Sequence, residues 1–169
     1  MRPIRITAAI ITCVLTGCFG YQIGPAKPNY LREVHTIAVP TFENHTLIPR
    51  IEVLVTDTVI KQLQQDGTFK IAGDGNADAT LEGDITQINR APARSVRGNV
   101  LQTTEFAMTM QVKYRLIAHN GSDVLGSGIA FGKTSFFVST DPTTDERQAL
   151  PLATEDLATR LTTQLTEGW

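Results

Sequence analysis

The sequence predicts an α+β domain in which two amphipathic helices pack on one face of a largely antiparallel sheet. Three patterns indicate this fold. Apolar residues recur every three or four positions in residues 48–63 and again in residues 149–165, as on one face of a helix. Between them, residues 104–118 alternate between large apolar side chains and polar or small ones, which is typical of a half-buried strand. A chain that has both the helical period and the two-residue period of a strand is expected to layer helices on a sheet.

The first 17 residues have the pattern of a lipoprotein signal peptide. Arg2 and Arg5 precede a mostly apolar segment of ten residues, Ile6–Leu15. A helix of that length covers about 15 Å, half of a hydrocarbon core of roughly 30 Å, so the segment is too short to span a membrane. Leu15-Thr16-Gly17-Cys18 resembles the lipobox of bacterial lipoproteins, in which the cysteine is acylated and becomes the first mature residue. The alternatives are an ordinary secretory signal with Cys18 incidental, or a buried N-terminal strand.

Acylation of Cys18, by diacylglycerol and palmitate, would supply a covalent lipid, and no other cofactor is expected. Two or more acyl chains anchor a protein stably, whereas one holds it only marginally. Phe19 follows the cysteine where lipoproteins retained in the inner membrane often have Asp, so the resemblance implies lipid anchoring at the periplasmic face of the outer membrane. Because Cys13 leaves with the signal, the mature chain would have no thiol for a disulfide, a zinc site or a nucleophile.

The mature chain is expected to be a single domain, residues 34–169, joined to the lipid by a tether, residues 18–33. The tether is rich in Gly and Pro, and the 152 mature residues have the size of one ordinary domain. Without the signal, 13 basic and 17 acidic residues give a net charge of −4. This charge argues against a partner that is a nucleic acid.

The first half of the domain is predicted to be a strand and a helix. Val34–Val39 is rich in β-formers and is followed by Pro40, which cannot donate to a sheet ladder and so fits the end of a strand. Thr46 is the expected N-cap of the helix, and Pro49 suits its first turn. The helix is expected to end before Gly67.

The second half is predicted to be mainly antiparallel strands. Phe69–Ala72 is a short strand, and Leu81–Ile85 alternates as a half-buried strand does. The long strand of residues 104–118 follows. His119–Ser122 then forms a hairpin turn into a strand over Leu125–Phe131, because Asn and Gly tolerate the positive φ angles of such turns.

Glycines and prolines shape the predicted last strand and the terminal helix. Gly126, Gly128 and Gly132 leave one face of the last strand nearly bare, which predicts either a twisted or bulged strand or the close approach of a partner. After a loop at Asp141-Pro142, the terminal helix is expected to be kinked or begun by Pro151.

The sequence contains no constellation typical of catalysis. The titratable candidates are three histidines and two acidic pairs: His35, His45, His119, Glu82 with Asp84, and Glu155 with Asp156. The histidines lie apart without metal-ligand spacing, and the acidic pairs fall on polar faces where carboxylates are normally solvated. Nucleophile elbows, phosphate-binding loops and dinucleotide fingerprints are absent from the sequence. The chain is therefore predicted to be neither an enzyme nor a metal protein.

A basic loop is predicted over residues 90–103, between two strands. Arg90, Arg94 and Arg97 lie within eight residues of one another. Positive charge at that end or face of the sheet would also come from Lys133, Lys113 and Arg115. Such a cluster suits ligands with several phosphates, because Arg binds phosphate bidentately. The alternative is a loop whose charges are merely solvated.

With these features, the chain resembles the LptE family of lipopolysaccharide-assembly lipoproteins. The resemblance is carried by residues 15–21, by Ile37–Thr46, by Ala77–Ile85 and by the terminal helix. It implies two helices on a mixed four-stranded sheet, which plugs the LptD β-barrel in the outer membrane, helps to assemble it and takes part in lipopolysaccharide delivery. It also implies lipopolysaccharide contacts at basic residues at the loop end of the sheet, here Arg90, Arg94, Arg97 and Lys133.

The segment Ile37–Asn44 also resembles a second group of periplasmic lipoproteins, those related to penicillin-binding-protein activators and to curli secretion proteins. That resemblance implies a regulator or a subunit of a secretion pore. The partner found in membranes distinguishes the two interpretations.

Overall fold

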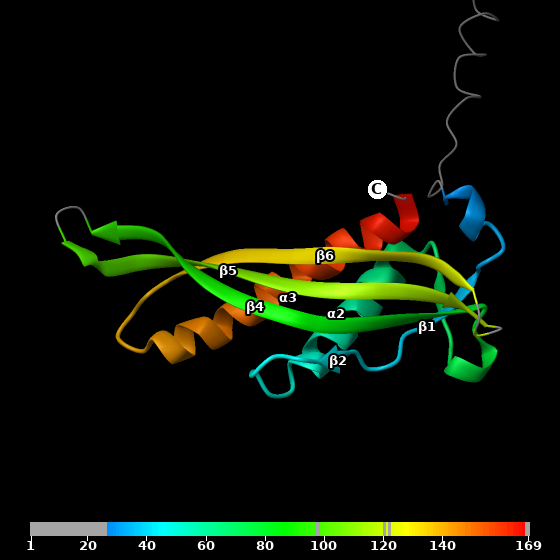
Figure 1. The fold of residues 1–169 in the computed structure, drawn as a ribbon, viewed down its shortest axis with the longest axis horizontal. Coiled ribbons are helices and arrows are strands. Elements are labelled where there is room, and N and C mark those ends of the chain that lie inside the picture. Colours follow the sequence, from blue (N-terminus) through cyan, green and yellow to red (C-terminus); the bar gives the residue numbers. More distant parts are fainter. Residues whose placement is uncertain (1–26, 97–98, 120, 122, 168–169) are drawn as a thin grey trace, which may run out of the picture.

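The computed structural model describes residues 27–96, 99–119, 121 and 123–167 (Figure 1). The signal peptide, Cys18, most of the tether and Arg97 lie outside these ranges. In chain order, the elements are η1 (Asn29–Leu31), β1 (Thr36–Ala38), β2 (Glu43–Asn44), α2 (Ile51–Asp66), β3 (Lys70–Ile71), η2 (Asp74–Asn76), β4 (Ala79–Val96), β5 (Asn99–Ala118), β6 (Val124–Phe137) and α3 (Pro142–Glu167).

The sheet is mixed and has six strands, not four. Its order is β3-β1-β4-β5-β6, and β2 also pairs with β4. The pairs β4–β5 and β5–β6 are antiparallel, whereas β1 and β2 run parallel to β4 and β3 runs parallel to β1. The strand that the sequence analysis did not predict is β2, which lies where a turn was expected. A strand of two residues is too short to show alternation, so only its pairing with β4 reveals it.

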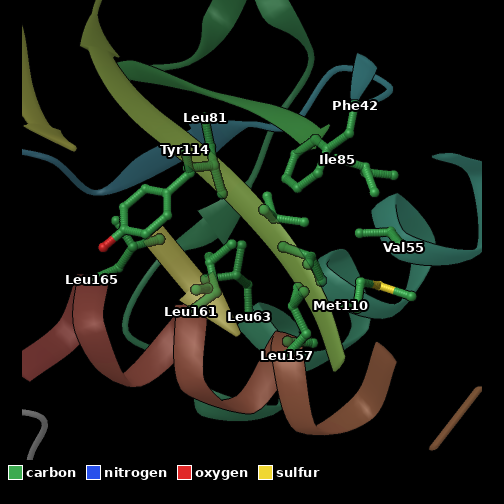
Figure 2. Close-up of a cluster of buried hydrophobic side chains, with 14 of the residues drawn as sticks. Phe42, Val55, Leu63, Leu81, Ile85, Met110, Tyr114, Leu157, Leu161 and Leu165 are labelled. Atoms are coloured by element: carbon green, nitrogen blue, oxygen red, sulfur yellow. The ribbon is translucent and has the colours of Figure 1, made fainter. Parts of the chain in front are cut away.

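Both helices cover the same face of the sheet, as the apolar stripes predict (Figures 1 and 2). Val55 and Leu63 of α2 meet Leu157 and Leu161 of α3 and Met110 of β5 in one cluster, and each is at most 1% exposed. Burial of a large apolar side chain contributes about 1.5–3 kcal/mol, so these residues contribute strongly to stability. The expected α+β class is confirmed.

The start of α2 differs from the prediction. The helix begins at Ile51, after Arg50 in the left-handed region at φ 63°, so Thr46 is not its N-cap. The side chain of Asn44 instead holds the preceding turn: its Oδ1 accepts the Thr46 N–H at 2.9 Å, and its Nδ2 donates to the Ile48 carbonyl at 2.9 Å. An Asn that bonds its own backbone locally competes with helix formation. The end of α2 before Gly67, at φ 74°, is as predicted.

The terminal helix is longer than predicted. Asp141 caps it by accepting the Thr143 and Thr144 N–H groups at 3.1 and 3.3 Å, and Pro142 is its first residue. The Thr144 hydroxyl also donates to the Asp141 carboxylate, and this bond, followed by the N–H bonds, lowers the pKa of Asp141. Pro151 lies inside α3 and does not begin it. The expected loop at Asp141-Pro142 is therefore the start of the helix.

The glycines of β6 allow close approach within the chain itself. A Cβ added at Gly132 would overlap the carbonyl oxygen of Ala153 and lie 2.6 Å from the Leu157 Cβ, both on α3. A Cβ at Gly128 would lie 2.6 Å from the hydroxyl oxygen of Tyr114. Thus α3 and a neighbouring side chain occupy the bare face that the sequence analysis left open to a partner.

Candidate functional site

The face of β4, β5 and β6 opposite the helices carries the candidate site, and we call it the open face. Along β5, Met108, Met110 and Val112 point to the helices and are fully buried. The residues between them point the other way, because successive side chains of a strand alternate. Among the described residues, no helix covers this opposite face of the sheet (Figure 1). The open face includes Glu82, Asp84, Gln87, Asn89, Thr109, Gln111, Lys113, Arg115, Ser127, Ile129, Phe131 and Lys133.

The sign of the charge on the open face changes from β4 to β6. Glu82 and Arg115 are register partners on β4 and β5, and their side chains form an ion pair of 3.0 Å. Lys113 stands opposite Asp84 in the register, and Lys133 of β6 stands opposite an uncharged Thr109. The β4 side is therefore acidic, whereas the basic residues lie on β5 and β6.

Apolar side chains also lie on the open face. Ile129 is 43% exposed and Phe131 is 40% exposed, and both belong to β6. Their register partners on β5 are Lys113 and Gln111. The β6 side of the open face thus combines apolar surface with a lysine, Lys133, two residues further along the strand. This combination suits a ligand that has both apolar and anionic parts.

The predicted basic loop is not a loop. Arg90 and Arg94 lie within β4, which continues to Val96 before β5 begins at Asn99. The register is irregular between Pro92 and Arg94, and a bulge of this kind lets a sheet accommodate a proline. Charged and proline residues therefore misled the sequence analysis, because here they belong to a long hairpin.

The predicted basic residues do not form one cluster. Arg90 is the register partner of buried Met108, so it points to the helix side, where it forms an ion pair with Glu146 of α3. Arg94 lies 3.7 Å from the Glu105 carboxylate. Lys133 pairs in register with Thr109, four residues from Glu105, a separation of about 13 Å along a strand. Lys133 lies on the open face, and Arg94 pairs with Glu105, which lies on the same side of β5 nearer the hairpin end. Arg97 and Cys18 lie outside the described residues.

The histidines occupy three different settings. His35 Nδ1 lies 2.9 Å from the Glu33 carbonyl oxygen, and the His119 backbone N–H donates to the Asp78 carbonyl at 2.9 Å. The Asp78 carboxylate accepts the backbone N–H groups of His35 and Thr36, and these bonds lower its pKa. They join the start of β1 to the start of β4.

His45, unlike the other two, meets carboxylates. Its Nε2 lies 3.5 Å from Glu43 and 3.9 Å from Asp84, and the three ligand atoms lie within 4.8 Å of one another. Among the described residues this is the one group that could hold a metal ion. The sequence analysis missed it because β2 brings His45 to a residue distant in sequence. All three side chains are more than a third exposed, and we assign no ion to them.

A hollow of about 360 Å³ adjoins this group at the β4 side of the open face. Its lining residues are Pro40, Thr41, Glu43, Glu82, Gly83, Asp84 and Arg115. The lining carries three carboxylates and one guanidinium, which disfavours a phosphate-bearing ligand there. Within the described ranges, no helix is both long and apolar enough to cross a membrane.

Comparison with known proteins gives one family. The family model named LptE and described as lipopolysaccharide-assembly matches residues 34–165, which include every strand and both long helices except the last residues of α3. None of the curated proteins compared with the chain matches it.

Several solved structures share the fold. A protein of family DUF330 from Xanthomonas campestris is 16% identical, with a TM-score of 0.56 over 84% of this chain and 90% of that one. A PelC dodecamer from Paraburkholderia phytofirmans is 17% identical, with a TM-score of 0.53 over 85% and 94% of the two chains. A minor lipoprotein from Acinetobacter baumannii is 12% identical, with a TM-score of 0.51 over 80% and 94%. At these identities the likeness concerns the fold alone.

Proposed function

Because the chain belongs to the LptE family of lipopolysaccharide-assembly proteins, we propose that it is an outer-membrane lipoprotein that fills an LptD-type β-barrel. There it helps to assemble the barrel and to deliver lipopolysaccharide to the outer leaflet. Acylated Cys18 anchors it at the periplasmic face.

The observation that carries this proposal is the extent of the family match. It covers residues 34–165 and so includes the complete sheet with its open face. The composition of the open face supports the plug role. Barrel interiors are polar, and Thr109, Gln111 and Lys113 offer polar partners to such a wall.

Lipopolysaccharide contact is assigned to the basic side of the open face. Lys113 and Lys133 are exposed there, and Ile129 and Phe131 lie beside them. Phosphate groups of the ligand would meet the two ammonium groups, and acyl chains would meet the apolar side chains. Arg90 is a poorer candidate because it faces α3 and pairs with Glu146.

Copurification tests the plug role. The full chain, with an affinity tag at its C-terminus, is isolated from membranes in mild detergent, and its partners are identified by mass spectrometry. We expect a large barrel of the LptD type. A cell-wall synthase, or a ring made only of this chain, would contradict the proposal. A Cys18→Ala variant behind a cleavable signal should still bind the barrel, since the barrel and not the lipid holds the domain.

Crosslinking tests the ligand contact separately. Lys113→Ala with Lys133→Ala should reduce crosslinking of lipopolysaccharide to the lipoprotein while the barrel still copurifies. Lys61→Ala with Lys70→Ala is the matched control, because it removes the same charge from α2 and β3. The single variant Arg90→Ala should leave crosslinking unchanged. If Arg90→Ala lowers crosslinking and the open-face variant does not, the assignment to the open face is wrong.

A further inference from the structure

A hollow of about 140 Å³ lies at the end of the sheet where α3 finishes. Four elements surround it, namely η1, β5, β6 and α3. Of its lining residues, only Ser127 also belongs to the open face, so the hollow is separate from the proposed lipopolysaccharide contact. The lining consists of Tyr30, Leu31, Tyr114, Leu116, Gly126, Ser127, Gln164 and Leu165.

Glycines of β6 make room for the hollow. Tyr114 and Leu116 of β5 are buried on the helix side of the sheet. Their register partners on β6 are Gly128 and Gly126. The Tyr114 side chain fills the space over Gly128, whereas a Cβ added at Gly126 would meet only Tyr30, at 4.0 Å. Gly126 therefore forms an open floor, over which a ligand can approach the backbone closely.

The 3-10 helix η1 holds Tyr30 at the rim of the hollow. Leu31 is 1% exposed and anchors η1 in the core, and its N–H donates to the Pro28 carbonyl at 2.9 Å. Lys27 fixes the preceding chain, because its Nζ donates to the Val34 carbonyl at 2.9 Å. The Tyr30 side chain is nevertheless 58% exposed, so the aromatic ring is available to a ligand.

The hydroxyl group of Tyr114 has unused hydrogen-bonding capacity. The residue is 6% exposed, and its oxygen lies beside Leu165 (Figure 2). Among the described residues, this hydroxyl has no hydrogen-bond partner. Burial, and then the proximity of Tyr30, raise the pKa of Tyr114, so the hydroxyl keeps its proton at neutral pH and can donate.

Gln164 has unused capacity as well. Its Nε2 donates to the Ile129 carbonyl, but its buried Oε1 has no partner within the described part of the chain. Buried polar groups are nearly always hydrogen-bonded in proteins. The lining therefore combines two aromatic rings with polar groups that a ligand can satisfy, which is the usual composition of a small-molecule site.

The lining also restricts the chemistry of the ligand. The described residues around the hollow include no charged side chain, so an ionic ligand would lose hydration without gaining a counter-charge. An alkyl chain would leave the Tyr114 hydroxyl unpaired. A cavity of about 150 Å³ accommodates benzene, so the hollow has the size of one six-membered ring. A sugar ring meets all three conditions, because it is neutral, carries hydroxyl groups at its edge and presents C–H groups on its faces.

We propose that this hollow is a binding site for one neutral sugar ring. The C–H face of the sugar packs on the exposed Tyr30 ring, its edge lies over Gly126, and its hydroxyl groups bond the hydroxyls of Tyr114 and Ser127. The site does not depend on the proposed function, since the ring can belong to a saccharide of any source.

Saturation-transfer NMR tests the site with three neutral probes: glucose, galactose and N-acetylglucosamine. The full chain is purified from membranes in a detergent that has no sugar headgroup. At least one probe should give a saturable signal. If the folded chain gives no saturable signal with any of the three, the proposal is wrong. It is equally wrong if decanoate binds in the hollow and no sugar does.

Substitutions in the lining locate the binding. Gly126→Val should abolish the signal, because its side chain fills the floor, whereas Ser135→Val adds a valine elsewhere on β6 and should leave the signal unchanged. Tyr114→Phe removes one hydrogen bond and should weaken binding by about tenfold. Circular dichroism confirms that each variant is folded. Sugar binding that survives in a folded Gly126→Val variant overturns the proposal.

Two variants of Tyr30 test the stacking contact. Tyr30→Ala should weaken sugar binding by about tenfold, because it removes the ring, whereas Tyr30→Phe keeps the ring and should retain most of the binding. Since Tyr30 is largely exposed, neither change should unfold the domain. Equal binding by the two variants would contradict the role given to this ring.

Further arms separate this site from the open face and identify the source of the sugar. Lys113→Ala with Lys133→Ala should leave sugar binding unchanged even where lipopolysaccharide crosslinking falls. Loss of sugar binding in this variant would place the sugar on the open face and overturn the proposal. The lipid-free core oligosaccharide of lipopolysaccharide and a peptidoglycan fragment then compete with the bound probe in separate samples, and the stronger competitor identifies the source.

Discussion

The two faces of the sheet differ although the same strands build them. On the covered face, Met108, Met110 and Val112 are fully buried beneath the helices. On the open face, the intervening Thr109, Gln111 and Lys113 keep part of their surface exposed. Strand alternation thus separates the residues that stabilise the fold from those available to a partner. Substitutions on one face should therefore change stability, and substitutions on the other should change binding.

The largest loss of stability is expected from a substitution in the buried face of α3. Leu157→Ala should lower the free energy of unfolding by about 2–5 kcal/mol, because it removes a fully buried side chain and leaves a cavity. Urea denaturation followed by circular dichroism measures this change. Leu152→Ala on the same helix is the control, since Leu152 is 55% exposed. Equal losses for the two variants would show that α3 does not cover the sheet as described.

The next effect concerns the contact between α3 and β6. Gly132→Ala should destabilise the domain by about 1–3 kcal/mol, because the added methyl group overlaps the backbone of α3. Gly126→Ala on the same strand should change stability little, since its Cβ would meet only Tyr30, at 4.0 Å. Thermal unfolding of the two variants compares them directly. A stable Gly132→Ala variant would mean that α3 packs further from β6.

The smallest effect on stability is expected on the open face. Lys113→Ala should change the free energy of unfolding by no more than about 0.5 kcal/mol, because an exposed lysine adds little to a folded core. The same variant should weaken crosslinking to lipopolysaccharide, if the proposed contact is correct. A loss of stability comparable with that of Leu157→Ala would show that the two faces are not separate in function.

Long periodic segments were predicted well from the sequence. The stripe of residues 48–63 falls in α2 from Ile51 onward, the stripe of residues 149–165 lies in the C-terminal part of α3, and the alternation of residues 104–118 lies within β5. Each pattern repeats over several turns or residues, so burial on one side leaves a clear signal. Element ends were predicted less well, because they depend on the local hydrogen bonds of Asn44 and Asp141 and on the backbone angle of Arg50, which leave no periodic pattern.

The candidate site was predicted only in part. Lys133 lies on the open face and its role stays a prediction, whereas Arg90 and Arg94 lie in a strand and not in the predicted loop. Their separation depends on the register of β4 against β5, including the irregularity near Pro92. A difference of one residue in register reverses the face of a side chain. Proximity in sequence therefore could not show that Arg90 points to α3.

The sequence by itself determined the fold class, the positions of the two helices and the long strand, and the resemblance to the LptE family. These properties follow from local periodicity and from short motifs, which depend only on neighbouring residues. The tertiary structure alone decided three other properties: the sheet of six strands, the packing of Gly132 against α3, and the hydrogen bonds that Asp156 and Gln164 make to the edge of β6. Each of these joins residues far apart in the chain, and such contacts leave no periodic signal in the sequence.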